Sequence, residues 1–247
     1  MEGRYEGTVV RELIREKGFW SAVLLALIGM AAAVPFYQIK LPLETGQFVF
    51  YYQSALGSRI LGFLLPVAAV LPMGAVYVRE ASGGFLKLYL ARISRSEYIR
   101  RKTIQIYVSG LLTFFAAGVI LLICCFLFLY PLEVKGDFPI ESFLDAGAML
   151  LRICLVGGML AEISGIFAVL FQNYYMAYGL PFVCYYLLII LKERYLPKLY
   201  CLYPVEWIQA EQFWGSDGTG LWIFLAVVSA AVMSLHGLLL HYRLQEI

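Results

Sequence analysis

The chain has 247 residues, of which 62% are hydrophobic and 15% charged, and its mean hydropathy is +0.78. Soluble domains contain about 25% charged and roughly 45–50% apolar residues, so the composition excludes a water-soluble globular enzyme of this length. The net charge of +2 gives little information, and we expect no nucleic-acid partner.

Charged residues are confined to short segments, which leaves long runs without any charge. About 18 consecutive apolar residues are enough to cross a bilayer as a helix. The pattern therefore predicts an all-α, multi-pass protein of the cell membrane, with one transmembrane domain over residues 1–247 embedded in the lipid bilayer. We expect six spans, at residues 19–37, 60–78, 104–130, 146–170, 174–191 and 221–241.

The segment 1–18 precedes the first span. Within it, residues 8–17 (TVVRELIREK) have an apolar face and a charged face. A helix of this kind lies along a membrane surface, so we expect an N-terminal interfacial helix on the cytoplasmic side. The other interpretation is a short cytoplasmic helix that only anchors the chain.

The loop 79–102, between the second and third spans, carries seven basic residues but only two acids, Glu80 and Glu97. Basic loops of membrane proteins stay in the cytoplasm. This loop therefore predicts the orientation of the spans on either side of it.

The same loop has features that a plain connector does not need. At Gly83-Gly84 the chain can turn, because glycine reaches backbone angles closed to other residues. Phe85, Leu88 and Tyr89 then fall on one helical face. We interpret the loop as a surface presented to a cytoplasmic partner; the alternative is that its charge only sets the topology.

The stretch 146–191 is too long for one span, because 163–191 alone is free of charge over 29 residues. We divide it into two spans that turn at Gln172-Asn173. Upstream of the turn, Gly157, Ala161 and Gly165 are spaced four apart, which lets another helix approach closely. The partner helix can belong to this chain or to another.

Two ionisable residues fall within the fourth span. Arg152 can extend its charge to the outer surface, whereas Glu162 lies nine residues from the turn, about 13 Å deep. Their separation of ten residues places them on different faces, so we expect no ion pair between them. A carboxylate at this depth is a candidate functional group. The alternative is a protonated or hydrogen-bonded side chain that faces other helices.

The segment 192–220 is the longest outer loop, and Pro204 can begin a helix within it. We expect a short interfacial or re-entrant helix there. With both termini inside, 12 Lys and Arg residues lie on the inner side and seven on the outer side, as the positive-inside rule requires. The basic segment 192–198 falls outside in this count; were it inside, the number of spans before it would differ.

The sequence lacks the common motifs for nucleotide binding and for metal binding. The chain lacks GxxxxGK[ST] and HExxH, its cysteines form no CxxC, and its two histidines, His236 and His241, lie near the end of the last span. We therefore expect no catalytic residue, no metal site and no directly bound cofactor.

The order of residue types over 78–102 also matches the pattern of a known protein family. An acid is followed by a Ser-Gly pair, an amphipathic stretch, a basic segment and a lysine; here these are Glu80, Ser82-Gly83, Phe85–Ala91, Arg92–Arg95 and Lys102. With six spans around it, this pattern resembles the permease subunit of type-2 ABC exporters, of the small six-span bacterial type. Ile93 stands where that family often has proline, and Gly84 where it often has threonine.

The resemblance implies a permease subunit that pairs with a second permease subunit, identical or paralogous, and binds a separate cytoplasmic ABC ATPase. ATP and magnesium would be held by that partner, whose hydrolysis drives efflux of an unidentified substrate, such as a peptide, a drug or a lipid-like molecule, including in bacteriocin immunity. The resemblance assigns ATPase coupling to Glu80, Gly83, Gly84, Phe85, Leu88, Tyr89, Arg92 and Arg95.

Two other functions fit the sequence. One is a membrane-embedded enzyme that uses Glu162, which would need converging polar groups from other spans. The other is a membrane assembly or immunity protein that transports nothing. A soluble ATPase that co-purifies with the chain would favour the exporter over both.

Overall fold

The computed structural model describes residues 11–32, 42–134, 136, 139–215 and 218–245. This part is helical and holds no β-strand beyond one isolated bridge between Leu43 and Glu133. Residues 11–15 are also helical. The named helices are α2 (Lys17–Ala31), α3 (Gln47–Leu56), α4 (Arg59–Val70), α5 (Val76–Ser82), α6 (Phe85–Leu90), α7 (Arg95–Phe128), η2 (Tyr130–Leu132), α8 (Ile140–Phe171), α9 (Tyr174–Ile190), η3 (Leu191–Tyr195), η4 (Tyr200–Leu202), α10 (Pro204–Gln209) and α11 (Thr219–Gln245).

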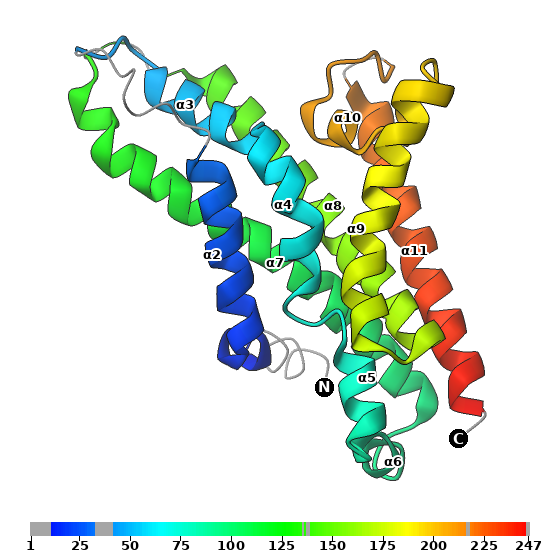
Figure 1. Cartoon of the computed structure of the whole chain (residues 1–247). Helices are drawn as coiled ribbons and strands as arrows, with labels where there is room; N and C mark the ends of the chain where they lie inside the picture. Colours follow the sequence, from blue (N-terminus) through cyan, green and yellow to red (C-terminus); the bar gives the residue numbers. More distant parts are fainter. Residues whose placement is uncertain (1–10, 33–41, 135, 137–138, 216–217, 246–247) are drawn as a thin grey trace.

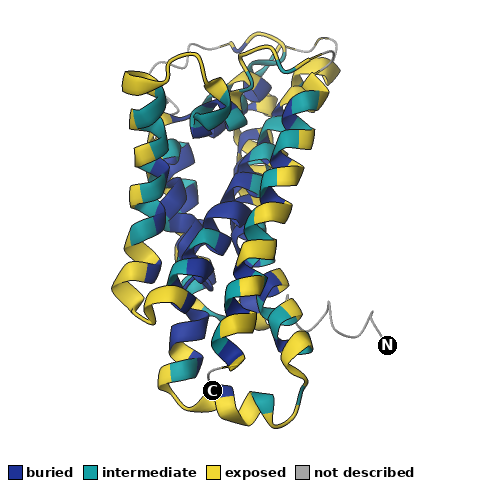
Figure 2. Cartoon of the chain, turned by 90° about the vertical axis from the view of Figure 1, so that its right-hand side faces the viewer, coloured by how far each residue is buried: buried dark blue, intermediate teal, exposed yellow. Residues whose placement is uncertain are grey.

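The long helices run between two ends of an elongated bundle (Figure 1). One end, the α6 end, holds α5, α6, the start of α2 and the end of α11. The opposite end, the α10 end, holds α3 and α10. Figure 2 shows that the inward faces of the helices are buried, whereas the outward faces are largely exposed. Exposed apolar side chains on those outward faces suit contact with lipid.

Four helical segments are long and apolar enough to cross a membrane: 95–132, Ile140–Phe171, Tyr174–Tyr195 and Thr219–Gln245. The pair α3 and α4, bent by 54°, would add a fifth. Within the described residues, the apolar helix α2 has 15 residues and is therefore short for a membrane span. The prediction of an all-α protein compatible with a membrane is confirmed at this level.

The second predicted span, 60–78, is not one continuous helix. Helix α4 ends at Val70, residues 71–75 form a turn, and α5 begins at Val76. Pro72 lies in the turn and lacks the amide hydrogen that a continuous helix would use. The prediction depended only on hydrophobicity. Because the residues of the turn are also apolar, hydrophobicity could not reveal the break.

Helix α3 was not expected from the sequence. The Glu133 carboxylate accepts hydrogen bonds from the backbone amides of Gly46 and Phe48 at the start of this helix, which favours it. At its other end, Ser58 begins α4: its hydroxyl oxygen accepts from the amides of Ile60 and Leu61, both at 3.1 Å. These contacts explain the bend between α3 and α4.

The division of 146–191 into two helices is confirmed. Helix α8 ends at Phe171, and Gln172 adopts a left-handed conformation with φ of 50°. The Asn173 side chain then accepts a hydrogen bond of 2.8 Å from the Tyr175 amide and begins α9.

Other predicted elements are found in part. The helix expected in the outer loop is α10, which begins at Pro204. The predicted span 221–241 lies within α11, and the predicted span 104–130 lies within the helical segment 95–132. Of the N-terminal predictions, residues 1–10 of the segment 1–18 and residues 33–37 of the first span lie outside the described part.

The small residues of α8 pack against helices of the same chain. A Cβ atom on Gly110 of α7 would overlap the Gly157 carbonyl and the Ala161 side chain, and one on Gly157 would overlap the Phe114 ring. One on Gly165 would come within 2.8 Å of the His236 ring in α11. The seam predicted on α8 therefore joins α7 and α11.

Replacing Gly110 by alanine should destabilise the protein by about 1–3 kcal/mol, because the added methyl group overpacks the contact between α7 and α8. The matched control is Gly147→Ala in α8, where a Cβ meets nothing within 4 Å and alanine is the better helix former. The measurement is the midpoint of thermal unfolding in detergent. Equal midpoints for the two variants would contradict the seam.

Candidate functional site

The α6 end has a sharply turned helix that projects from the bundle. Helix α5 ends at Ser82, and Gly84 then adopts φ of +73°, in the left-handed region that favours glycine. Helix α6 follows directly, over Phe85–Leu90. The turn predicted at Gly83-Gly84 is confirmed, and it directs α6 away from the axis of α5 (Figure 1).

Helix α6 has one buried position and a broad exposed face. Leu86 is 3% exposed and packs in a cluster with Tyr77 and Tyr98. In contrast, Phe85, Leu88 and Tyr89 are 58%, 62% and 45% exposed. Three large apolar side chains are thus presented together on a helix of six residues.

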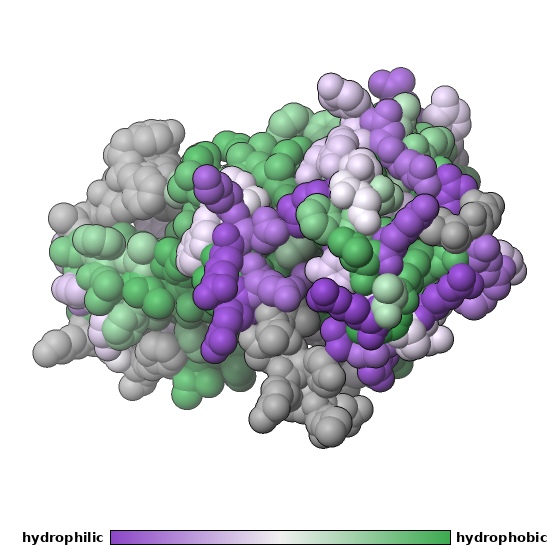
Figure 3. All heavy atoms as spheres, turned by 90° about the horizontal axis from the view of Figure 1, so that it is seen from below, coloured by the Kyte–Doolittle hydropathy of each residue, from purple (hydrophilic) through white to green (hydrophobic). Residues whose placement is uncertain are grey.

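Exposed basic residues follow α6 in the chain. Arg92 is exposed in the connection, and Arg95 is exposed at the first position of α7, where the Ser94 hydroxyl accepts a hydrogen bond from the Glu97 amide. We call Phe85, Leu88, Tyr89, Arg92 and Arg95 the α6 surface. Figure 3 shows this end of the molecule, where hydrophilic side chains gather around smaller hydrophobic areas.

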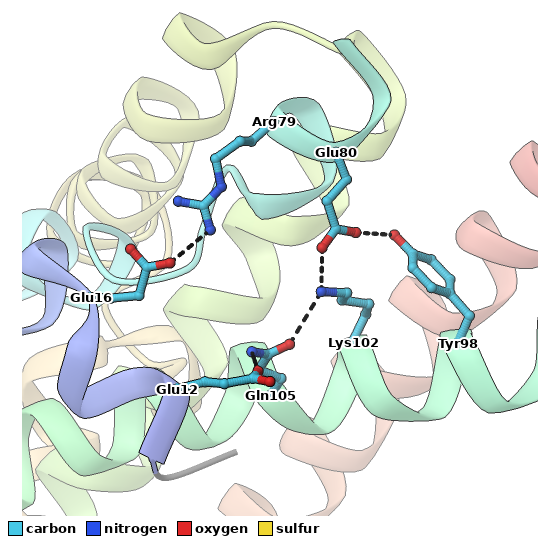
Figure 4. A network of polar contacts seen from close by, with 7 residues as sticks. All are labelled: Glu12, Glu16, Arg79, Glu80, Tyr98, Lys102 and Gln105. Carbon is cyan, nitrogen blue, oxygen red and sulfur yellow. Dashed lines mark hydrogen bonds and ion pairs between the residues drawn. The ribbon is translucent and has the colours of Figure 1, made fainter. Parts of the chain in front are cut away.

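Glu80 lies beneath the α6 surface. The family pattern places this residue in the partner-binding segment, but its side chain is 9% exposed and pairs with the Lys102 ammonium at 2.5 Å (Figure 4). The Tyr98 hydroxyl donates a hydrogen bond of 2.7 Å to the other carboxylate oxygen. Glu80 therefore joins α5 to α7 and does not itself face a partner.

The N-terminal segment is tied into the same network (Figure 4). Lys102 donates to Gln105 at 3.3 Å, and the Gln105 amide donates to the Glu12 carboxylate at 3.2 Å. Arg79 and Glu16 form a more exposed ion pair at 3.0 Å, which contributes little to stability.

A hydrophobic contact anchors this segment more firmly. Leu13 is fully buried, in a cluster with Met73, Val76 and Ile106. Residues 11–16 thus dock on the bundle through one apolar side chain and two acids, and the amphipathic pattern of 8–17 is used for protein packing over this part.

A second polar site lies inside the bundle, between α8 and α11. Glu162 and His236 are both 0% exposed, and Glu162 Oε2 is 2.5 Å from His236 Nδ1. No described residue bonds to their remaining polar atoms, Glu162 Oε1 and His236 Nε2. Gly165 leaves room for the imidazole ring, as its missing Cβ would lie against it.

The expectation that Arg152 and Glu162 do not pair is confirmed, because the acid pairs with His236 instead. Arg152 Nε is buried and has no hydrogen-bond partner among the described residues. His236 was not among the predicted site residues. No group of three or more His, Cys, Asp or Glu within the described residues is arranged to hold a metal ion.

Neither a scan against models of protein families nor a search of curated proteins finds a match to this chain. The resemblance to exporter permeases therefore depends on the order of residues in the loop 79–102 and on the apolar helices around it.

Proposed function

We propose that the chain is the membrane permease subunit of an ATP-driven ABC exporter, and that a cytoplasmic ATPase subunit binds the α6 surface. The observation that carries this proposal is the exposure of Phe85, Leu88 and Tyr89 at the α6 end. Exposed apolar groups within a polar surface mark a site of protein association. Arg92 and Arg95, which follow α6 in the chain and are exposed, supply charge that can steer an acidic partner.

The contacts beneath α6 can transmit a displacement of this helix to the neighbouring helices. Helix α6 is joined through Gly83-Gly84 to α5, and the pair of Glu80 and Lys102 joins α5 to α7. A partner that displaces α6 would therefore move α5 and the long helix α7 together. In this proposal the partner holds ATP and magnesium, and its closure moves the membrane helices of two permease subunits.

The proposal implies six membrane crossings with the α6 end in the cytoplasm. Helix α2 would provide the first crossing, and the bent pair of α3 and α4 with α5 would provide the second. The seven basic residues of 79–102 support this orientation.

The test replaces Leu88 and Tyr89 together by aspartate. We expect co-purification of the ATPase to fall by about tenfold or more, because buried apolar residues carry most of the affinity of an interface. Insertion should be unchanged, since all basic residues of the loop remain. The measurements are the amount of bound ATPase and the hydrolysis stimulated by the permease, each relative to surface expression.

The matched control is Phe213→Asp, because Phe213 is 81% exposed and lies beyond α10, at the opposite end of the bundle. It introduces one negative charge, where the pair introduces two, and lies outside the α6 surface. The proposal fails if the aspartate pair behaves like this control, or if no ATPase co-purifies with the parent protein.

A membrane-embedded enzyme that uses Glu162 is less well supported. Both members of the Glu162 and His236 pair are completely buried, so a substrate cannot reach them in this conformation.

A further inference from the structure

A cavity of about 620 Å³ opens at the α10 end, between the start of α4, the upper part of α9 and α10. Its volume lies in the range of small-molecule sites, about 300–1,000 Å³. It lies away from the α6 surface and from the Glu162 and His236 pair, none of whose residues line it. The function proposed above therefore leaves this cavity unexplained.

One side of the cavity is aromatic. Phe63 of α4 and Tyr186 of α9 both line it, with ring centroids 5.9 Å apart. Leu61 and Ile208, each buried, add apolar surface. Such walls suit an apolar or aromatic body, which gains free energy by leaving water.

The same cavity has a buried polar atom that lacks a partner. Tyr185 lines it and is 2% exposed, yet no described residue forms a hydrogen bond with its hydroxyl. Leaving a buried hydroxyl unpaired is unfavourable.

The rim of the cavity carries charge. Glu193 of η3 and Glu211, just beyond α10, line it together with Arg59 of α4, and all three are exposed. With the Lys192 ammonium beside the lining residue Tyr203, the rim is neutral overall, and Glu193 and Glu211 are its two acidic groups. No ion pair within 4.0 Å joins Glu193, Glu211 or Arg59 to another described residue.

At the rim, a cationic side chain of the protein itself lies close to an aromatic ring. The Lys192 ammonium lies 4.1 Å from the centroid of the Tyr203 ring, which is itself part of the lining. The Tyr203 hydroxyl donates a hydrogen bond of 3.3 Å to Glu193. Burial, and then the negative charge of Glu193, raise the pKa of this hydroxyl, so it stays a donor. Aromatic faces beside carboxylates are a favourable setting for organic cations.

We propose that this cavity binds a singly charged, amphipathic organic cation, with its apolar body against Phe63 and Tyr186 and its charge beside Glu193 and Glu211. The inference concerns binding alone and does not depend on an ATPase partner. If the chain is an exporter, the cavity is a site for its substrate.

The experiment uses the purified full-length protein in phosphatidylcholine nanodiscs, with no ATPase present. Radiolabelled tetraphenylphosphonium is the probe, and tetraphenylborate, which has nearly the same shape and the opposite charge, is its control. We expect saturable binding of the cation, about tenfold tighter than that of the anion.

Glu193→Gln and Glu211→Gln should each weaken cation binding about three- to fivefold, as expected for exposed charges, and Phe63→Ala should weaken it about tenfold. One variant should leave binding unchanged: Glu141→Gln removes an exposed acid that does not line the cavity.

The proposal is overturned if the parent protein shows no saturable binding of the cation, if the anion binds equally well, or if both glutamine variants bind like the parent. A failure to bind an ATPase would leave these measurements unaffected, so the two proposals are tested separately.

Discussion

Replacing Lys102 by methionine is expected to lower the free energy of unfolding by about 3 kcal/mol. The side chains of Lys102 and Glu80 are only 12% and 9% exposed, and breaking such a pair leaves a buried carboxylate without its counter-charge. The variant also removes the ammonium from beside the rings of Tyr89 and Tyr98, whose centroids lie 5.6 and 5.9 Å away. Denaturant unfolding in detergent, followed by tryptophan fluorescence, measures the loss.

Two controls separate a buried pair from a general effect of charge. The double variant with Glu80→Gln and Lys102→Met should regain more than half of the lost stability, because no uncompensated charge is left buried. Glu97→Gln affects a more exposed pair, with Arg101, and should cost less than about 1 kcal/mol. A loss for Lys102→Met no larger than that for Glu97→Gln would show that the network in Figure 4 does not hold α5 against α7.

The features that local sequence predicts well are those set by neighbouring residues. The turn at Gln172-Asn173 follows from a side chain that bonds to an amide two residues later, and the start of α10 follows from Pro204. Gly83-Gly84 and the exposed face of α6 are likewise readable, because a positive φ and a helical spacing are local properties.

The features that sequence reasoning missed depend on contacts between distant residues. The break before α4 is stabilised by the Ser58 hydroxyl, which donates a hydrogen bond of 2.9 Å to the Gly29 carbonyl in α2. The contact between Gln105 and Glu12 joins residues far apart in the chain. Apolarity alone indicates that a segment is buried in a membrane or a core, but not which helix lies beside it.

The sequence contained a clue to the Glu162 and His236 pair, because the depth of both residues in the membrane can be estimated from it. Glu162 lies nine residues before Phe171, the end of α8, and His236 lies nine residues before Gln245, the end of α11. Both helices end toward the α6 end of the bundle (Figure 1), so the two side chains reach equal depth, about 13 Å at 1.5 Å per residue. Whether they face each other depends on helix rotation, which the sequence does not give.

Glu162→Leu is expected to lower the free energy of unfolding by about 2–3 kcal/mol, because it leaves His236 Nδ1 buried without its partner, and both side chains are 0% exposed. Glu162→Gln keeps a hydrogen-bonding group of the same size and should cost less than about 1 kcal/mol. The double variant Glu162→Leu with His236→Leu should recover much of the loss, since apolar groups then replace both partners. If the double variant loses as much as the sum of the losses of Glu162→Leu and His236→Leu measured singly, the two residues do not interact.

Measurements of both stability and transport distinguish a packing role of the Glu162 and His236 pair from a functional role. If the pair only holds α8 against α11, the double leucine variant should support transport in proportion to the amount of folded protein at the membrane. If the pair works during the transport cycle, Glu162→Gln should reduce transport at normal expression, because it keeps the hydrogen bond but removes the titratable carboxylate. The measurement is efflux per folded molecule, with Glu141→Gln as the control for loss of an acid elsewhere on α8. Full transport by both the glutamine and the leucine variants would leave the carboxylate with a structural role alone.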